Sequence, residues 1–480
     1  MKNDVVFNRT KIVATIGPAS RRKDIMTELA KAGVNVFRLN FSHGSHEDHQ
    51  ITMGFIDEIN KELGTNCCAL QDLQGPKIRT NLIEDGEVQI FPGQRMVITT
   101  GEDVGTSEII STTYKSLTAD VKMGDKILID DGKLELKVTD TQNGNVVTQV
   151  VHGGPLKSRK GINLPNTNVS APSLTEKDIE DLEFGLSQDV DWVALSFVRD
   201  AADIIDLRQR IKAAGKDTRI VAKIEKPEAI ANIDAIIAET DAIMVARGDL
   251  GVEIPSEQVP IEQKKIIQKC NVAGKPVIVA TQMMESMIDN PIPTRAETND
   301  VANAVLDGAD AVMLSAESAS GKYPIQAVRS MSSILSTIEM AADTIYNREL
   351  KKDVNSKPVE LNDELIAGAV RLGDSINSKA LVGITKTGYT AFKVSSFRPK
   401  SDIFVFTDNK KLLRMMSLIW GVRGFYYPGQ EAMDGMLEHI EESLREERLL
   451  EIGDVYINLA PMPFHQSDVH TNMMKVNVVE

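Results

Sequence analysis

The sequence has only three cysteines in 480 residues, and two of them, Cys67 and Cys68, are adjacent. They fall in a predicted strand, where neighbouring side chains point to opposite faces. The cysteines therefore provide neither a disulfide framework nor the ligand spacing of a metal site. No apolar run approaches the roughly 20 residues that cross a bilayer, and the first residues lack the apolar stretch of a secretory signal. We expect a cytoplasmic protein without a membrane segment.

Basic residues are in deficit, because 54 Lys and Arg stand against 69 Asp and Glu, for a net charge of −15. Such a chain is not expected to bind nucleic acid or an anionic membrane. Hydrophobic residues make up 42% and charged residues 26%, which is typical of folded domains. At about 150 residues per domain the length predicts roughly three domains. The seven histidines show no metal-ligand pattern, and Walker-type and GxGxxG loops are absent.

Short β-branched runs alternate with helical stretches, such as 201–215 and 294–308, which is typical of parallel strands joined by crossover helices. Eight such strands are the number that closes a (β/α)8 barrel, with an open doubly wound sheet as the alternative. Nearly every strand ends in polar residues, as the mouth of a barrel does when it holds a site. The predicted strands are 11–16, 35–40, 67–72, 192–197, 219–225, 242–247, 276–281 and 311–316.

Two further regions depart from this alternation of strands and helices. Residues 74–171 contain short predicted strands separated by turn dipeptides, without a convincing helix, and predict a small all-β domain inserted at the barrel mouth as a lid. The barrel then comprises 1–73 and 172–345 and resumes with a helix over 174–189, preceded by Ser173. After a polar linker at 346–363, five strands and intervening helices predict a doubly wound α/β domain over 346–480.

The strand ends supply the chemistry. Strict alternation puts Arg38, Asn40 and Ser42 on one face of their strand, a set suited to a phosphate or carboxylate. Lys223 and Glu225 share a face of another strand, either as a plain structural ion pair or as part of a site. The ARGDLG segment brings Asp249 to the same mouth. Two carboxylates suit Mg²⁺, which keeps several waters and takes further ligands from substrate phosphates.

For three other candidate positions, an ordinary structural explanation stands beside the functional one. Gly248 permits close backbone approach to an anion, but glycines after strands are also common turn residues. Thr281 places a hydroxyl at a strand end. Lys160, late in the insertion, reaches phosphates only if the lid closes, and is otherwise a solvated lysine.

Eight ordered segments resemble the pyruvate kinase family. The last two, GKPVIVATQMMESM and PTRAETNDVANAVLDGADAVMLSAESASGKYP, are long and highly specific. The resemblance implies a barrel with a β lid and a C-terminal α/β domain, and transfer of the phosphoryl group of phosphoenolpyruvate to ADP to give pyruvate and ATP. The segments are 10–20, 35–49, 70–80, 158–165, 222–230, 243–255, 274–287 and 293–324.

The resemblance also implies residue roles. Arg38 is similar to the arginine that holds the substrate phosphate, and Lys223 to the lysine that stabilises the transition state. Glu225 and Asp249 are similar to the magnesium ligands, with manganese as an alternative metal. Thr281 with a nearby water is a candidate for the proton path to the enolate. The substrate-binding positions are Arg38, Gly248, Asp249 and Thr281, and the nucleotide-binding positions are Asn40, Ser42, His43, Arg79 and Lys160.

One departure concerns potassium. Family members that require it carry Asp-Thr-Lys-Gly-Pro-Glu, where this chain has Asp72-Leu73-Gln74-Gly75-Pro76-Lys77. Leu73 removes a hydroxyl ligand, and Lys77 places an ammonium where the others hold a carboxylate. The rest of that pocket is retained as Asn40, Ser42 and Asp72. A fixed ammonium would repel a monovalent cation, so we predict activity independent of potassium.

The second departure is in the C-terminal domain. TKTGYT resembles the family's loop for sugar-phosphate effectors, through Thr385, Thr387, Gly388 and Thr390, although a plain strand-to-helix turn explains it equally well. The glycine-rich loop of many relatives is replaced by residues 460–474. The family implies a homotetramer, with Arg295 similar to an interface position.

Two other functions are compatible with parts of this pattern. A magnesium-dependent aldolase-type lyase acting on pyruvate-like substrates would use Glu225, Asp249 and Thr281, but gives no role to Lys223, Arg38 or Lys160. A non-catalytic effector-binding protein on a relic barrel predicts eroded strand ends, whereas the candidate positions are filled.

Overall fold

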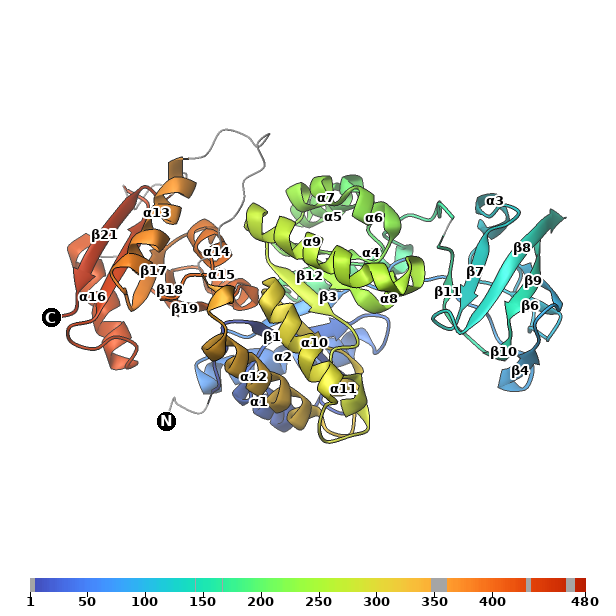
Figure 1. Ribbon diagram of the computed structural model, residues 1–480, viewed down its shortest axis with the longest axis horizontal. Coiled ribbons are helices and arrows are strands. Elements are labelled where there is room, and N and C mark those ends of the chain that lie inside the picture. The colour runs from blue at the N-terminus through green and yellow to red at the C-terminus, as the bar shows by residue number, and fades with distance from the viewer. Residues whose placement is uncertain (1–4, 143, 166, 347–360, 429–432, 463–470) are drawn as a thin grey trace.

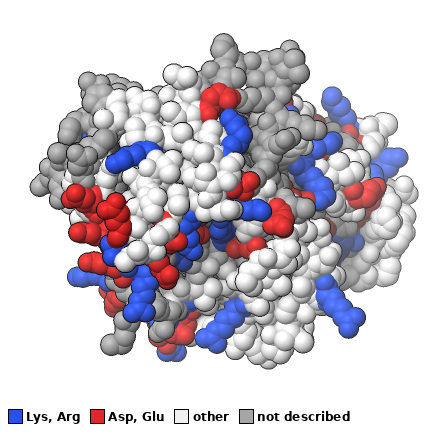
Figure 2. All heavy atoms as spheres, turned by 60° about the vertical axis from the view of Figure 1, so that its left-hand side comes forward, with Lys and Arg blue, Asp and Glu red and all other residues white. Residues whose placement is uncertain are grey.

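The computed structural model describes residues 5–142, 144–165, 167–346, 361–428, 433–462 and 471–480. Three bodies lie in a row, with the barrel between the insertion and the C-terminal domain (Figure 1). Among the described residues no helix is long and apolar enough to cross a membrane. On the face shown in Figure 2, acidic and basic side chains are interspersed, so the net negative charge does not gather into one patch there.

Eight parallel strands close a barrel in the order β1-β16-β15-β14-β13-β12-β3-β2. The closed barrel predicted from the strand count is therefore confirmed over the open sheet. The strands are β1 (Lys11–Ile16), β2 (Val34–Asn40), β3 (Cys68–Asp72), β12 (Trp192–Leu195), β13 (Arg219–Ile224), β14 (Ala242–Ala246), β15 (Val277–Ala280) and β16 (Ala311–Leu314).

Several of these strands end one or two residues earlier than the sequence predicts. β12 ends at Leu195 because Phe197 has a φ of 54°, and β15 ends at Ala280 because Thr281 has a φ of 69°. Both angles lie in the left-handed region, which no strand residue adopts. The chain therefore turns sharply at the mouth, and places these residues in the loops above the barrel rather than in the sheet.

Alternate strand residues face the barrel interior or the surrounding helices. The interior cluster includes Val13, Leu70, Trp192, Val221 and Met244, all essentially buried. The other face packs against the helices, which form the larger core cluster. These helices are α1 (Lys23–Lys31), α2 (His46–Leu63), α4 (Glu176–Ser187), α5 (Ala201–Ala213), α6 (Pro227–Ala231), α7 (Ile233–Glu239), α8 (Arg247–Glu253), α9 (Val259–Ala273), α10 (Arg295–Asp307), α11 (Ala316–Ala319) and α12 (Pro324–Ala341).

The predicted helix at 174–189 is shorter, and its cap differs from the expected one. α4 begins after Thr175, whose hydroxyl accepts the N–H of Asp178 while the Asp178 carboxylate accepts the N–H of Thr175. This reciprocal capping box satisfies two backbone donors at once. Thr175, rather than Ser173, therefore fixes where the barrel resumes.

The insertion between β3 and β12 is built almost entirely of strands and has its own apolar cluster, including Ile98, Ile127 and Leu136. A six-stranded sheet has the order β11-β7-β8-β9-β5-β6, beside a β10-β4 pair. One four-residue helix, α3 (Leu117–Asp120), occurs where no helix was expected. The strands are β4 (Glu87–Ile90), β5 (Arg95–Thr99), β6 (Ile109–Ser111), β7 (Lys126–Ile129), β8 (Leu134–Gln142), β9 (Asn145–His152), β10 (Gly154–Lys157) and β11 (Ile162–Asn163).

The C-terminal domain has a five-stranded sheet in the order β19-β18-β17-β20-β21, with β21 antiparallel to β20. Most of the predicted linker lies outside the described residues, and its last three positions are helical because α13 begins at Leu361. The elements are α13 (Leu361–Ser375), β17 (Ala380–Ile384), α14 (Tyr389–Ser396), β18 (Asp402–Thr407), α15 (Lys410–Met415), β19 (Val422–Tyr426), α16 (Met433–Glu446), β20 (Val455–Ala460) and β21 (Met473–Val478).

A buried arginine joins this domain to the base of the barrel. The guanidinium of Arg398, 2% exposed, lies 3.0 Å from Asp310 Oδ2 and donates to the carbonyl of Gly308 at 2.8 Å. Its Cζ lies 4.9 Å from the ring centroid of Trp420. The other tryptophan, Trp192, donates its indole N–H to the carbonyl of Met415 at 3.2 Å. Both tryptophans therefore report on the boundary between barrel and C-terminal domain.

We expect Arg398→Met to lower the free energy of unfolding by about 3 to 5 kcal/mol, because it leaves the buried Asp310 carboxylate uncompensated. Urea unfolding followed by tryptophan fluorescence measures the loss. Lys400→Met is the matched control, since Lys400 is 52% exposed and pairs with the 92% exposed Asp343, and it should change stability by less than about 1 kcal/mol. Equal unfolding midpoints for the two variants would contradict the role given to Arg398.

Candidate active site

The polar strand ends meet at the carboxyl-terminal mouth of the barrel, centred on the buried carboxylate of Asp72 at the end of β3. Arg38 on β2 donates from Nε to Asp72 Oδ2 at 2.7 Å, and from Nη1 to the hydroxyl of Thr15 at 2.9 Å. Lys223 on β13 lies with Nζ 3.2 Å from Asp72 Oδ1. Asp72, which the sequence suggested as a polar strand end and as part of a cation pocket, thus brings Arg38 and Lys223 together.

The ammonium of Lys223 lies between two carboxylates. Besides its contact with Asp72, Nζ is 3.0 Å from Glu225 Oε1 and donates to the hydroxyl of Ser196 at 2.7 Å. That hydroxyl donates in turn to the carbonyl of Leu73 at 2.7 Å. The Lys223–Glu225 ion pair is therefore formed. It belongs to a larger cluster that includes Ser196, a site residue that the sequence presented only as one of many polar strand ends.

These contacts set the ionisation of the cluster. Burial alone would lower the pKa of Lys223, but Asp72 and Glu225 outweigh it and raise that pKa well above its usual range. Burial opposes ionisation of Asp72 too, yet Lys223 and Arg38 leave its pKa lowered. For Glu225, burial and the negative charge of Asp249 prevail over Lys223, and its pKa is raised. The mouth therefore holds a permanently charged ammonium beside the carboxyl group of Glu225, whose ionisation the surroundings disfavour.

Glu225 and Asp249 form the candidate metal site. Glu225 Oε2 accepts the backbone N–H of Phe197 at 2.7 Å, and Asp249 lies in the first turn of α8, 30% exposed. Among the described residues no three His, Cys, Asp or Glu side chains gather as a metal site, so this pair is sparse. Burial and then the neighbouring Asp249 charge raise the pKa of Glu225, and a divalent cation bound between these two side chains would favour their ionised forms. The donor set fits a hard ion that keeps waters and takes substrate oxygens.

Thr281 fixes the backbone at the start of α8. Its hydroxyl accepts the N–H of Gly248 at 2.7 Å and donates to the carbonyl of Ala280 at 2.6 Å. A Cβ at position 248 would lie 3.3 Å from that hydroxyl oxygen, closer than side chains normally approach. Arg247 donates to the carbonyl of Thr281 at 2.8 Å. A side chain at position 248 would therefore press against Thr281, where the two loops approach closely.

The residues predicted for the nucleotide fall into two groups. Asn40 and His43 line a cavity of about 520 Å³ that Arg38 and Thr15 also reach, beside the cluster of charges. The carboxamide oxygen of Asn40 accepts the N–H of Ser42 at 3.1 Å.

The other two predicted residues, Arg79 and Lys160, belong to the insertion, where the backbones of Arg79 and Gly161 form an isolated bridge. The Lys160 ammonium lies 2.7 Å from Asp130, also in the insertion. It is therefore held by its own domain in this arrangement.

The residues of the predicted monovalent-cation pocket also lie in two separate places. Leu73 is 1% exposed, next to Asp72, whose two oxygens face Arg38 and Lys223. The ammonium of Lys77 lies 3.8 Å from Asp249 Oδ1 and is one-third exposed. The positive charge of Lys77 therefore lies beside Asp249, a candidate metal ligand.

The predicted effector loop forms the turn between β17 and α14. Thr385 accepts the N–H of Gly388 at 2.9 Å, and Gly388 has a φ of 87°. The hydroxyls of Thr390 and Thr471 are 2.5 Å apart, and the carbonyl of Thr387 accepts from Arg219 of the barrel at 3.0 Å. The threonines are thus used in turn and domain contacts, and part of the neighbouring 460–474 segment lies outside the described residues.

Comparison with known proteins agrees with this arrangement. Residues 7–328 match the family "pyruvate kinase, barrel domain", and residues 363–477 match "pyruvate kinase, alpha/beta domain". The chain is 44% identical over 474 residues to the pyruvate kinase of Geobacillus stearothermophilus, covering 98% of this chain and 80% of the relative. It is 42% identical over 476 residues to that of Staphylococcus saprophyticus, covering 98% and 81%.

A solved structure extends the likeness to three dimensions. The structure of a pyruvate kinase from Cryptosporidium parvum superposes with a TM-score of 0.92 at 36% sequence identity, covering 100% of this chain and 98% of that one. Family matches over both regions, identity above 40% across nearly the whole chain and a shared fold all agree. This chain belongs to the pyruvate kinase family.

Proposed function

We propose that this chain transfers the phosphoryl group of phosphoenolpyruvate to ADP through the cluster built on Asp72. The supporting observation is the buried ammonium of Lys223, 3.2 Å from Asp72 and 3.0 Å from Glu225, with Arg38 on the other side of Asp72. In the reaction the phosphorus–oxygen bond to the enol breaks and a bond to a terminal phosphate oxygen of ADP forms. The enolate left behind takes a proton at carbon and becomes pyruvate.

Charge stabilisation is the main task of such a site, because phosphoryl transfer depends chiefly on positioning and electrostatics. The guanidinium of Arg38, held by Asp72 and Thr15, binds the phosphate of the substrate in a fixed orientation. Lys223 neutralises charge that develops on the transferring group. Because its ammonium is already held by Asp72, Glu225 and Ser196, little reorganisation is needed as the charge moves.

Glu225 and Asp249 would hold Mg²⁺, with Mn²⁺ as an alternative. The ion would neutralise phosphate charge and polarise the substrate oxygens that complete its shell. Thr281 and Gly248 fix the backbone beside this pair, through the hydrogen bond of 2.7 Å between them. The hydroxyl of Thr281 is our candidate to pass a proton toward the enolate, by turning its hydrogen from the carbonyl of Ala280 toward a water beside the substrate.

The nucleotide occupies the cavity beside Arg38 in this proposal, next to Asn40 and His43, with the backbone of Ser42 hydrogen-bonded to Asn40. Arg79 and Lys160 reach its phosphates when the insertion closes, and Lys160 then exchanges Asp130 for phosphate oxygens. Closure of this kind would exclude water from a reaction that must not become hydrolysis.

Three further features extend the proposal beyond the reaction. We place the domain boundaries at 73/74, 171/172 and 345/346. We propose a homotetramer, with Arg295 at one interface. The loop with Thr385, Thr387, Gly388 and Thr390 is our candidate effector site, and its ligand is a phosphorylated sugar.

A coupled assay for pyruvate, with and without ADP, tests the reaction. We expect pyruvate from phosphoenolpyruvate only when ADP is present, with one ATP formed for each pyruvate. The alternative lyase on the same barrel would release pyruvate without ADP. It is not favoured by the family match, and it leaves Lys223 and Arg38 without a role. Release of pyruvate at equal rates without ADP would overturn the proposal.

Lys223→Met should lower kcat by about 10³-fold, because it removes roughly 4 kcal/mol of transition-state stabilisation. Binding of Mn²⁺ and phosphoenolpyruvate should weaken far less, as measured by titration without turnover. Lys275→Met is the matched control, since Lys275 is partly buried and donates to the carbonyl of Thr240 at 2.7 Å, at the opposite end of the barrel. A kcat near that of the wild type in Lys223→Met would refute the role of Lys223.

Activity should be independent of potassium. Leu73 offers a monovalent cation no oxygen, and the Lys77 ammonium beside Asp249 adds a positive charge at the mouth that further disfavours such a cation. Replacing potassium by tetramethylammonium at constant ionic strength should leave kcat within about twofold. The double variant Leu73→Thr/Lys77→Glu should gain a potassium requirement. A collapse of wild-type activity in tetramethylammonium would contradict the prediction.

A further inference from the structure

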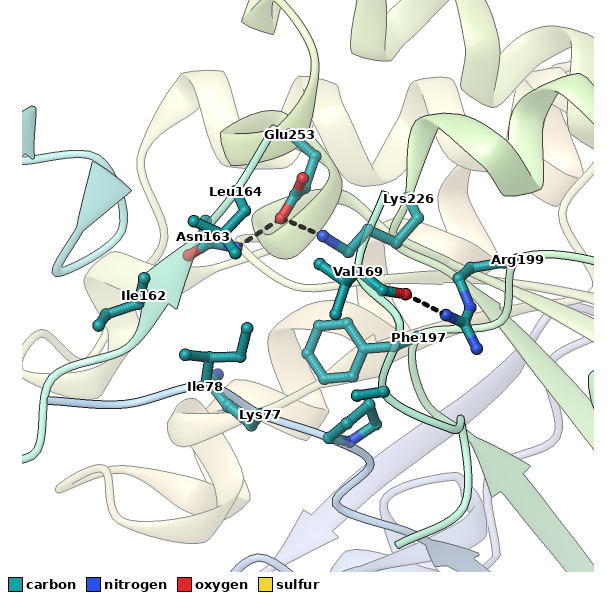
Figure 3. A pocket seen from close by; sticks show the side chains of 12 residues that line it. Lys77, Ile78, Ile162, Asn163, Leu164, Val169, Phe197, Arg199, Lys226 and Glu253 are labelled. Carbon is teal, nitrogen blue, oxygen red and sulfur yellow. Dashed lines mark hydrogen bonds and ion pairs between the residues drawn. The ribbon is translucent and has the colours of Figure 1, made fainter. Parts of the chain in front are cut away.

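A small cavity separates the insertion from the barrel, next to the mouth (Figure 3). Its volume is about 30 Å³, and its walls are mostly apolar. On one side of it, three polar side chains converge from three separate segments, Glu253, Lys226 and Asn163 (Figure 3). The apolar wall consists of Ile78, Ile162, Leu164, Val169 and Phe197.

One carboxylate oxygen holds the other two side chains. Glu253 Oε1 accepts from Lys226 Nζ at 2.9 Å and from Asn163 Nδ2 at 2.9 Å. The side chain of Glu253 is 1% exposed and that of Lys226 is 10% exposed. The ion pair is therefore largely shielded from solvent, and two hydrogen bonds to Glu253 Oε1 define its geometry.

Each partner of the ion pair is attached next to a candidate metal ligand. Lys226 directly follows Glu225 at the end of β13. Glu253 ends α8 one turn after Asp249, so the two carboxylates lie on the same face of that helix. A link between Lys226 and Glu253 therefore ties the segment that carries Glu225 to the segment that carries Asp249.

The cavity wall contacts Glu225 by a second route. The ring of Phe197 lines the cavity, and its backbone N–H donates to Glu225 Oε2 at 2.7 Å. The residue holds a φ of 54°, a conformation that costs free energy in a non-glycine residue. Packing against the cavity maintains this strained turn, and the turn aims its N–H at the carboxylate.

Stability does not account for the ion pair. Burying two charges costs desolvation that their attraction often fails to repay. In addition, Glu253 Oε2 is buried without a hydrogen-bond partner among the described residues, an arrangement that costs further free energy. The energetic cost of the pair therefore favours a role other than stability, namely holding the two segments that carry Lys226 and Glu253.

We infer that the Glu253–Lys226 ion pair, with Asn163 as its third member, is a positioning unit that sets the separation of Glu225 and Asp249 and connects it to the insertion. The inference rests on the proposed function, because it takes these two carboxylates as the metal ligands. The unit touches neither substrate nor metal, and acts by fixing β13 and α8 relative to one another.

Asn163 brings the insertion into the unit. It is the last residue of β11, where the chain returns from the insertion to the barrel. The same return segment is held by Arg199, which donates to the carbonyl of Val169 at 2.5 Å (Figure 3). Three residues before Asn163 lies Lys160, our candidate for a phosphate contact. The position of the insertion and the spacing of the carboxylates are thus linked through one oxygen atom.

Binding of Mn²⁺ to the substrate-free enzyme, measured by electron paramagnetic resonance, tests the inference without turnover. We expect Glu253→Gln and Lys226→Met each to weaken Mn²⁺ binding about tenfold. Their double variant should weaken it by about the same factor, because the two residues act as one unit. A simple field effect predicts opposite results, since losing a negative charge weakens cation binding and losing a positive charge strengthens it.

Controls separate this inference from the proposed function. Glu225→Gln and Asp249→Asn should abolish measurable Mn²⁺ binding, and if they do not, the metal assignment itself is wrong. If they do while Glu253→Gln and Lys226→Met stay within twofold of the wild type, the positioning unit alone is refuted. Arg208→Met breaks the 2.9 Å pair with Asp241 at the opposite end of the barrel and should leave Mn²⁺ binding unchanged.

Two more variants complete the test. Lys226→Arg keeps the charge and should restore Mn²⁺ binding to within about threefold of the wild type, which also guards against a folding defect in Lys226→Met. Asn163→Leu should weaken binding two- to threefold and raise the KM for ADP, because it frees the return segment of the insertion. Wild-type values for both quantities in Asn163→Leu would remove the insertion from the unit.

Discussion

The site depends on one buried ammonium held between two carboxylates. Lys223 would be costly to bury alone, and Asp72 and Glu225 would repel each other without it. Each charge therefore offsets the cost of burying the others, and the three side chains are stable at this position only together. Arg38 joins through the second oxygen of Asp72, so a single carboxylate orients both Arg38 and Lys223.

The barrel makes this cluster possible by bringing distant segments to one rim. Arg38, Asp72 and Lys223 lie more than 30 positions apart in the sequence, and parallel strands place their carboxyl ends side by side. Sharp turns at Phe197 and Thr281 then aim a backbone N–H and a hydroxyl at Glu225 and Gly248. The strain of these turns is located where the chemistry requires defined directions.

The eight barrel strands could be predicted from the sequence because buried parallel strands form short apolar runs that end in polar residues. The meeting of Arg38 and Lys223 followed from that reasoning, whereas the central position of Asp72 did not. A carboxylate at a strand end has the same pattern whether it binds two cations or faces water. Ser196 was recognised only as one of many polar strand ends, and the N–H of Phe197 was missed because a left-handed turn at a non-glycine residue leaves no local signal.

The C-terminal sheet and the insertion show the same limit. That β21 is antiparallel depends on how the chain returns, which strand composition does not record. The pairing of Lys160 with Asp130 joins residues 30 positions apart, and no periodicity relates them. Long-range polar contacts are therefore the part of this site that the sequence does not predict, whereas it does predict the apolar framework around them.

The insertion has a separate apolar cluster of its own, and only two short stretches of chain connect it to the barrel. Because its interior shares few side chains with the barrel, swinging it would disturb no common core. Substitutions within its own apolar cluster, away from Asn163 and the cavity wall, should therefore leave the catalytic framework at the barrel mouth intact. The packing inside the insertion can accordingly vary without altering the packing of the barrel.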